Sequence, residues 1–315
     1  MTSVNKLARE AWPWTFLAAI AVWLATIAYT GGQGSGAILT AALSFATFSV
    51  IVGLGQMLVV TSGPGNVDLS IPATITLAGV VAMKVMDTEN ARLLIGIAAA
   101  LGAAFAVGLV NYALIRILRI PPIIATLSSS FLVLSTAISY GRGIRIKPPP
   151  LLADFATARV MGIPLVAIFT LILSIILAQI LLRTVYGRSL LATGQNARAA
   201  WLSGLDPERT RLITYVASAL LAGVAGLCLS GFSGGAALNM GEEFLLASIA
   251  VVVIGGTSVA GGKASVPGIW GAALFMYLLV SMLNTFGASA GIRLILTGVI
   301  IIAVIVAATR NTGGR

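Results

Sequence analysis

The chain has 315 residues, of which 58% are hydrophobic and 9% are charged, whereas soluble domains carry about 25% charged residues. This composition excludes an ordinary soluble domain and indicates an integral membrane protein. The net charge of +10 comes from lysine and arginine residues scattered between apolar runs, so it does not indicate nucleic-acid binding, for which a basic patch is expected.

Few residues in this chain are suited to chemistry. The sequence contains no histidine, which is the commonest metal ligand and general base, and its one cysteine, Cys228, lies within an apolar run. A single thiol can form no disulfide within the chain. No combination of nucleophile, base and metal ligands is visible, so we expect a protein that is not an enzyme and that carries no cofactor or metal of its own.

About ten segments are apolar and long enough for membrane-spanning helices, each of which needs about 20 apolar residues. They predict an all-α, polytopic membrane protein with a single domain over residues 1–315. The third and eighth segments adjoin glycine-rich polar stretches, where a helix can break and re-enter the membrane. The segments are 12–30, 37–61, 69–86, 93–115, 120–140, 163–182, 212–231, 244–260, 266–286 and 292–309.

The positions of lysine and arginine predict the orientation, because these residues are enriched in cytoplasmic loops. If the N-terminus is cytoplasmic, so is the C-terminus. The cytoplasmic side then holds twelve of the nineteen basic residues: Lys6, Arg9, Arg116, Arg119, Arg183, Arg188, Arg198, Arg209, Arg211, Lys263, Arg310 and Arg315. The loop between Gly141 and Pro164 runs against this asymmetry, because it places four basic residues outside: Arg142, Arg145, Lys147 and Arg159.

Two short stretches suggest an internal repeat. Ser70-Ile71-Pro72 and Ser265-Val266-Pro267 each follow a region rich in valine and glycine, and each opens a new apolar run. Transporters are often built from two such halves. Chance similarity between stretches of biased composition explains the match equally well.

The polar interval 183–211 separates two apolar runs and predicts a cytoplasmic loop with a short helix. Asn196 is a good N-cap, and Gly204 is suited to the left-handed conformation that ends a helix. Asp206 is placed to cap the next helix, with Pro207 at its first position and Glu208 in its first turn. The short helix is therefore held between two fixed boundaries.

One face of this short helix combines a cation with apolar side chains. Arg198, Trp201 and Leu202 share this face through their i, i+3 and i+4 spacing. Such a face suits docking to a protein partner. Alternatively, Trp201 lies in the lipid headgroup layer, as aromatic residues at interfaces commonly do.

Three stretches together resemble the ribose-type permeases of bacterial ABC importers. One is the loop pattern Gly187-Arg188 followed by Ala192-x-Gly194-x-Asn196-x-x-Ala199-Ala200-x-x-Ser203-Gly204. The second is AVVVIGGTSVAGGK, residues 250–263, followed by Gly268 and Gly271-Ala272, and the third is GQMLVVTSGPGNVDLS, residues 55–70. The sequence departs from the family pattern at Pro64-Gly65-Asn66, where the family usually has two glycines and an aliphatic residue, and at Pro72, where it usually has glycine.

The resemblance implies a permease of the type II ABC importer kind that forms half of a pore for a sugar or sugar-like solute. It implies a cytoplasmic ATPase that binds ATP and magnesium, a periplasmic or lipid-anchored solute-binding protein, and a second permease copy or homologue. It also implies that membrane lipid surrounds the spans and that the location is the bacterial inner membrane. The loop 183–211 is then the coupling loop, with these residues expected to contact or support the ATPase interface: Asn196, Arg198, Ala199, Trp201, Leu202, Gly204 and Asp206.

Asp68 allows two interpretations. An acidic residue within a membrane is by default a functional candidate, so Asp68 and its polar neighbours Asn66 and Ser70 are candidate pore or gate residues. Alternatively, Asp68 caps the third apolar segment by accepting backbone N–H bonds. Proton coupling through Asp68 would make the protein an ion-coupled secondary transporter, which is the alternative to the ABC permease.

Four further polar residues in apolar segments are candidates for the pore or a gate: Asn111, Thr257, Ser258 and Asn284. Amides in apolar helices more often hydrogen-bond a neighbouring helix, and glycine-rich segments more often allow close packing. The stretch around Thr257 lacks the spacing of a phosphate-binding loop, because Ala264 follows Lys263 where that loop has serine or threonine.

The loop 142–155 is basic and contains three consecutive prolines, which favour a stiff extended chain. On the outer side, Arg142, Arg145 and Lys147 would suit acidic residues of a binding protein; a solvated loop or contact with anionic lipid headgroups is the alternative. Glu242 and Glu243, predicted on the same side, would suit basic residues of that partner.

Overall fold

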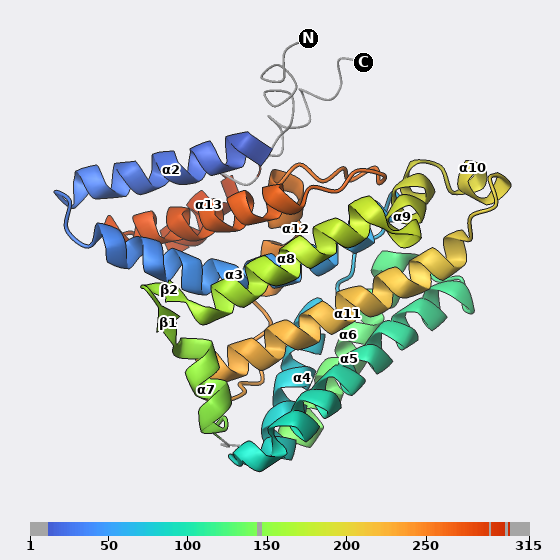
Figure 1. Cartoon of the computed structure of the whole chain (residues 1–315), viewed down its shortest axis with the longest axis horizontal. Helices are drawn as coiled ribbons and strands as arrows, with labels where there is room; N and C mark the ends of the chain where they lie inside the picture. The colour runs from blue at the N-terminus through green and yellow to red at the C-terminus, as the bar shows by residue number, and fades with distance from the viewer. Residues whose placement is uncertain (1–11, 144–146, 290, 300–301, 303–315) are drawn as a thin grey trace, which may run out of the picture.

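The computed structural model describes residues 12–143, 147–289, 291–299 and 302, and these are mainly helical (Figure 1). The described exception is a small antiparallel ribbon of β1 (Arg159–Val160) and β2 (Ile163–Pro164). The prediction of an all-α fold therefore holds for the described residues apart from this ribbon, which the sequence did not indicate.

Seven helices in the described part of the chain are long and apolar enough to cross a membrane. The third and eighth predicted segments are shorter helices, α4 (Ile71–Met86) and α12 (Phe244–Ile254). Of the tenth predicted segment, residues 292–299 and 302 are described and are helical, and its other residues lie outside the described part of the chain. The long helices are α2 (Trp12–Tyr29), α3 (Ser35–Thr61), α5 (Leu93–Arg116, preceded by the 3-10 turn η1, Asn90–Arg92), α6 (Pro122–Gly141), α8 (Leu165–Arg183), α11 (Pro207–Phe232) and α13 (Val266–Thr285).

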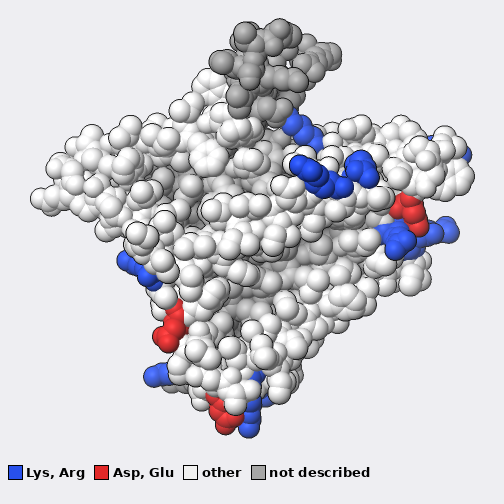
Figure 2. All heavy atoms as spheres, in the orientation of Figure 1, with Lys and Arg blue, Asp and Glu red and all other residues white. Residues whose placement is uncertain are grey.

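The outer surface of the bundle is apolar. On α8, the side chains of Leu171, Ile172 and Ile175 are each about half exposed, although water is an unfavourable environment for them. In the view of Figure 2, charged side chains gather toward the two ends of the helices and leave an uncharged band between them. Both features are those of a surface in contact with lipid.

The centre of the bundle depends on close backbone contacts. Helix α11 packs against α3, α4 and α5, and small residues lie where the helices cross. Gly55 of α3 faces Ser218, and Gly226 of α11 faces the carbonyl of Ile75 in α4, with too little room there for a side chain. Such small-residue contacts are the usual means of packing helices in a membrane, where lipid is as apolar as the side chains.

Two peripheral segments mark the opposite ends of α11. Helix α10 (Ala197–Leu202) lies beside its first residues, and α7 (Pro150–Thr157) packs against its last turns, where Gly231 contacts Leu152 and Ala156. Pro149 is extended, with φ −55° and ψ 144°, as predicted, but Pro150 begins α7, because proline suits the first turn of a helix. The segments predicted on opposite sides of the membrane therefore lie at opposite ends of the bundle (Figure 1).

Candidate functional site

The coupling segment, which we define as residues 183–211, contains two short helices. The predicted one is α10, whose N-cap Asn196 accepts a 3.0 Å hydrogen bond through Oδ1 from the backbone N–H of Ala199. Gly204 follows it with a φ of 85°, in the left-handed region. A second helix, α9 (Val185–Gln195), precedes it and was not predicted. The hydroxyl of Thr184 caps α9 by accepting from the N–H of Gly187 at 3.2 Å.

Helix α11 begins at the predicted cap. Asp206 Oδ1 accepts hydrogen bonds from the backbone N–H groups of Glu208 and Arg209, both at 3.0 Å, and Pro207 occupies the first helical position. The prediction that a helix starts here and continues into the seventh span is confirmed. The coupling segment thus connects to the long helix without a flexible joint at this end.

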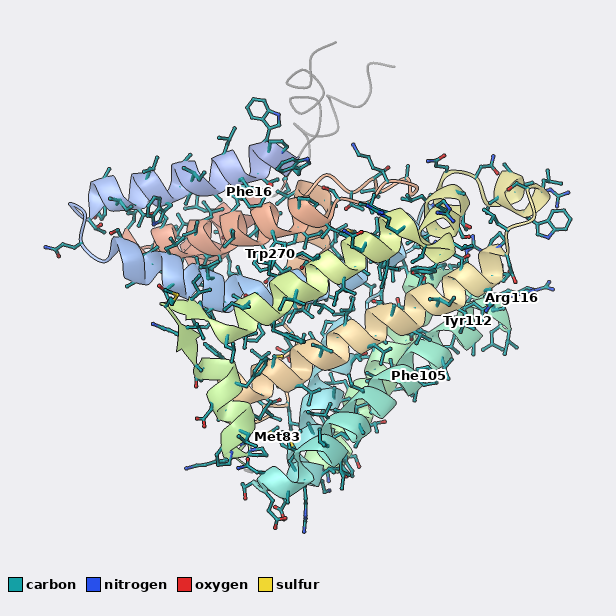
Figure 3. The ribbon with its side chains drawn as sticks, in the orientation of Figure 1. Phe16, Met83, Phe105, Tyr112, Arg116 and Trp270 are labelled. Carbon is teal, nitrogen blue, oxygen red and sulfur yellow. The ribbon has the colours of Figure 1, made fainter. Side chains whose placement is uncertain are left out.

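Glu208 joins the start of α11 to the end of α5. Its carboxylate lies 2.9 Å from Arg116 Nε and 3.2 Å from Arg211 Nη1, and Tyr112 donates to it at 3.5 Å. Figure 3 shows Tyr112 and Arg116 at the α10 end of the bundle, beside the first turns of α11. The sequence does not indicate this cluster, because its members come from separate helices.

The outer face of α10 is available to a partner. Trp201 and Leu202 are 55% and 68% exposed, and the guanidinium of Arg198 lies over the Trp201 ring, 4.8 Å from its centroid. This cation–π contact orients the indole on the helix surface. The predicted grouping of the three side chains on one face agrees with this geometry.

Helix α9 packs on two breaks in the helical structure. The first break, residues 62–70, connects α3 to α4, and the second break, residues 255–265, connects α12 to α13. The second break contacts the end of α3, directly before the first break, where Gly262 N–H donates to the carbonyl oxygen of Thr61 at 2.9 Å. Gly194 of α9 lies against both of these backbone groups and leaves no space for a Cβ. Gln195 Nε2 also donates to Gly262 O at 3.4 Å.

A second contact fixes α9 against α11. The hydroxyls of Tyr186 and Thr214 lie 2.9 Å apart and share a hydrogen bond. Burial raises the pKa of Tyr186 to about 12, so its hydroxyl is neutral at cellular pH. The coupling segment is therefore attached both to the breaks and to the side of α11.

Asp68 lies in the first break and is almost completely buried, with 1% of its surface exposed. Its Oδ1 accepts from the backbone N–H of Ser70 at 2.9 Å and from the Ser70 hydroxyl at 2.6 Å, and its Oδ2 accepts from Ser218 Oγ at 3.1 Å. The N-cap residue of α4 is Ser70. Asp68 thus orients the residue that precedes the helix and does not cap the first turn, as one of the two interpretations of the sequence had it.

Side chains from three other helices hold the first break. Asn111 Nδ2 of α5 donates to Ser70 Oγ at 2.7 Å, and Gln56 Oε1 of α3 accepts from Asp68 N–H at 3.3 Å. Thr126 of α6 accepts from Leu69 N–H at 3.1 Å. The interhelical hydrogen bond expected of Asn111 is present. Within the break itself, Asn66 Nδ2 donates to Ser62 Oγ at 3.0 Å.

The structure groups six of the seven predicted pore or gate residues near the breaks. Asn66, Asp68, Ser70 and Asn111 lie in or on the first break, while Thr257 and Ser258 lie in the second. Thr257 is buried, and its hydroxyl has no hydrogen-bond partner among the described residues. Asn284 is exposed near the end of α13 and bonds Arg293. Eighteen residues of helix, about 27 Å, separate Asn284 from Val266, so it does not join this group.

The predicted docking residues do not form one group. Arg142 and Lys147 flank the segment that leads to α7, and Arg145 lies outside the described residues. Glu242 and Glu243 are exposed in the turn before α12, where the preceding Gly241 lies against Pro72. They therefore lie beside the first turn of α4, and not at the α7 end of the bundle.

The two stretches of the suggested repeat occupy similar local positions. Ser70 precedes α4 and Ser265 precedes α13, and each helix has proline as its second residue. Ser265 Oγ caps its helix by accepting from Gly268 N–H at 3.3 Å, whereas Ser70 Oγ donates to Asp68. Each stretch thus ends a break and starts a helix, with different hydrogen bonding.

Sequence comparison identifies the family of the chain. A family model described as the permease component of branched-chain amino acid transport systems matches residues 37–305. The chain belongs to this permease family. It is therefore a transmembrane component of an ABC importer and a non-catalytic subunit of it. No solved structure matches the chain.

Named relatives cover most of this permease. It is 31% identical to the probable ABC transporter permease protein y4mJ of Sinorhizobium fredii, over 82% of this chain and 77% of that protein. It is 31% identical to the ribose import permease protein RbsC of Escherichia coli K12, over 81% and 80%, respectively. Identity to the D-allose transport system permease protein AlsC of the same strain is 30%, over 82% and 78%. The resemblance to ribose-type permeases is confirmed.

Proposed function

We propose that this permease forms half of the pore through which a bacterial ABC importer carries a sugar or a sugar-like solute. The support for this solute class is the similarity to permeases named for ribose and D-allose. A second permease copy or homologue would complete the pore. A solute-binding protein would deliver the solute, and a cytoplasmic ATPase would bind ATP and magnesium and drive the cycle.

The observation that carries the coupling mechanism is the position of α9 between α10 and the two breaks. An ATPase that moves the exposed face of α10 would move α9 with it, because one residue, Asn196, joins the two helices. Gly194 would pass this movement to both breaks, since it packs directly on Thr61 and Gly262. Such coupling requires that the ATPase bind the two pore states with different free energies.

The remaining site residues complete the proposal. Caps at Asn196, Gly204 and Asp206 hold the geometry of the coupling segment, with Ala199 inside α10, while Arg198, Trp201 and Leu202 contact the ATPase. The two breaks form the gate, and these residues in or next to them are the candidate gate residues: Asn66, Asp68, Ser70, Asn111, Thr257 and Ser258. Asn284 would line the pore at the other end of α13.

The orientation places α10 on the cytoplasmic side of the bacterial inner membrane, with both termini in the cytoplasm. The segment around α7 then lies outside, where Arg142, Arg145 and Lys147 would meet acidic residues of the binding protein. Glu242 and Glu243 lie beside α4, so they would meet that partner only where it reaches into the bundle.

The test of coupling uses the permease with its partner ATPase and solute-binding protein, reconstituted in proteoliposomes. We expect Trp201→Ala with Leu202→Ala to reduce solute-stimulated ATP hydrolysis and ATPase binding at least tenfold, because large apolar anchors dominate such interfaces. Leu182→Ala with Val185→Ala is the matched control, since these side chains are 72% and 65% exposed where α8 ends and α9 begins. Unchanged complex formation and hydrolysis in the α10 double variant would refute the assignment.

The test of the solute class is uptake of D-ribose, D-allose and L-leucine by the same proteoliposomes. ATP-dependent uptake of a sugar supports the proposal, and transport of leucine alone contradicts it. Uphill uptake by the permease alone, driven by an ion gradient, would instead indicate the secondary transporter.

A further inference from the structure

We propose that a groove on the outer, lipid-facing surface of the bundle binds one acyl chain of an anionic phospholipid, whose headgroup meets basic residues at the end of the groove. The groove has a volume of about 370 Å³ and lies between α2, α8 and α13. Figure 3 shows two of its lining residues, Phe16 on α2 and Trp270 on α13. Small-molecule pockets usually measure about 300–1,000 Å³, so the space is sufficient for a segment of hydrocarbon chain.

The lining of the groove is apolar and open to the surroundings. Leu171 and Ile175 of α8 line it and are 49% and 53% exposed. The polar side-chain groups of the lining are already paired, because Trp270 Nε1 donates to Ser174 Oγ at 2.9 Å and Ser174 Oγ donates to the carbonyl oxygen of Thr170 at 2.7 Å. The groove therefore favours a hydrocarbon chain, and the hydrocarbon that surrounds a membrane span is that of the lipid acyl chains.

One end of the groove is basic. Lys263 lies three residues before Val266, which lines the groove. Arg183 lies five residues of helix, about 7.5 Å, after Ala178, which also lines it. Arg188 Nη1 donates to the carbonyl oxygen of Arg183 at 3.5 Å, so a second guanidinium lies at this end of α8. The three basic residues are exposed, and in Figure 2 basic side chains gather around the junction of α8 and α9.

The charge at this end selects an anionic headgroup. Helices α2, α8 and α13 and the second break contain no acidic residue, so the positive charge is not offset by these elements. Basic pockets between helices on the cytoplasmic side of a membrane bind the headgroups of anionic lipids. The orientation proposed above places this end of the groove on that side. A lipid such as phosphatidylglycerol would match both parts of the site, whereas phosphatidylcholine carries a positive charge that the basic residues repel.

The position of the groove relates the lipid to the second break. Trp270 is the fifth residue of α13, which begins directly after that break. Its bond to Ser174 joins the start of α13 to α8. An acyl chain between these helices would favour the arrangement that they have here and limit movement of the second break. This consequence rests on the proposed function, whereas the binding of the lipid does not.

The experiment uses the full permease chain in phosphatidylcholine nanodiscs, to which phosphatidylglycerol with brominated acyl chains is added. Bromine quenches the fluorescence of tryptophan that it contacts, and the difference between the wild type and Trp270→Phe isolates the signal of Trp270. We expect brominated phosphatidylglycerol to quench Trp270 at a mole fraction about tenfold lower than brominated phosphatidylcholine, because each basic residue near the surface contributes about fivefold to the affinity for an anionic lipid.

Charge variants test the basic end, each measured with and without Trp270→Phe. Lys263→Gln with Arg183→Gln should weaken the preference for phosphatidylglycerol about fivefold for each charge removed. Lys147→Gln with Arg159→Gln is the matched control, because these exposed basic residues lie on either side of α7, at the opposite end of the bundle. The control should keep the wild-type preference.

A second pair of variants tests the groove itself. Ala178→Phe places a ring in the groove and should abolish the quenching of Trp270 by both lipids. Ala106→Phe is the matched control, because Ala106 is exposed on α5 and does not line the groove. Circular dichroism and gel filtration verify the fold of each variant, and the charge variants decide the question if Ala178→Phe does not fold.

Three outcomes overturn the proposal. They are equal quenching of Trp270 by the two brominated lipids, a wild-type preference in the variant without Lys263 and Arg183, and no quenching of Trp270 in the wild type. The last result would show that protein, such as a second copy of the permease, covers the groove. Because the measurement requires neither the ATPase nor the solute, failure of the proposed function leaves its result unchanged.

Discussion

Replacement of Gly194 by alanine provides the most direct test of how the coupling segment meets the breaks. An alanine Cβ would lie 2.9 Å from Gly262 Cα and far closer still to the Thr61 carbonyl oxygen and the Gly262 amide nitrogen. These are all backbone atoms, so no flexible side chain can turn away. Either α9 or the two breaks must move by about 1 Å, because a packed interior has no spare space.

The cost of Gly194→Ala follows from two effects. Overpacking costs about 1–3 kcal/mol, and loss of the bond between Gly262 N–H and Thr61 O would leave buried groups unpaired at about 1–3 kcal/mol more. The sum is about 2–6 kcal/mol, which is large compared with ordinary stabilities. We expect a fall in melting temperature of about 5–15 °C and uncoupling of transport from ATP hydrolysis.

The assay for Gly194→Ala combines thermal unfolding of the purified permease with solute uptake and ATP hydrolysis in proteoliposomes. Gly102→Ala is the matched control, because Gly102 lies within α5 and a Cβ there meets no atom within 4 Å. Alanine is favoured over glycine inside a helix, so this control should unfold at or above the wild-type temperature. Wild-type stability together with wild-type coupling in Gly194→Ala would refute the packing argument.

Three further variants test separate contacts. Asp206→Ala removes the cap of α11 and should destabilise the permease by about 1 kcal/mol, with Asp206→Asn close to wild type; equal melting temperatures for both would contradict the cap. Glu208→Gln should lower the free energy of unfolding by less than about 1 kcal/mol, because the ion pairs of Glu208 with Arg116 and Arg211 are partly exposed. A fall in melting temperature that does not depend on salt concentration would contradict this. Asp68→Asn keeps an oxygen for Ser70 and offers an amide to Ser218, so ATP-driven uptake should stay within about threefold of wild type; abolished uptake with a folded protein would show that the carboxylate itself is required.

Features that depend on neighbouring residues in the sequence were predicted well. The cap at Asn196, the left-handed Gly204 and the start of α11 at Pro207 each depend on a few adjacent residues, and all three are present. Most long spans were predicted for a related reason, since hydropathy over about 20 residues is enough to identify them. The eighth predicted segment ends six residues early, at Ile254, because Gly255 and a left-handed Gly256 stop α12.

Features that depend on tertiary contacts were not predicted. Helix α9 was missed because Gly187 and Gly194 lower its helix propensity, and both are required by packing on the backbones of Leu181 and Thr61. The cap at Thr184 was the local signal that could have indicated its start. A cavity of about 460 Å³ between α9, the first break and α11 was also missed, because Thr193, Arg211 and Tyr215 lie far from residues 63–66 in the sequence and line one space only in the fold.

The positions where this chain departs from the ribose-type pattern lie outside the contact that would couple the ATPase to the pore. Pro64-Gly65-Asn66 lies in the first break, where Pro64 and Asn66 line the cavity, and Pro72 is the second residue of α4, against Gly241. None of these residues belongs to the contact between Gly194, Thr61 and Gly262. The backbone contact that joins the coupling segment to the breaks therefore does not depend on the positions where this chain differs from the family pattern. Related permeases can share the way in which the ATPase moves the pore, while the residues around the cavity and at the start of α4 differ. Functional differences between this permease and its relatives should therefore depend on residues of the first break more than on residues of α10.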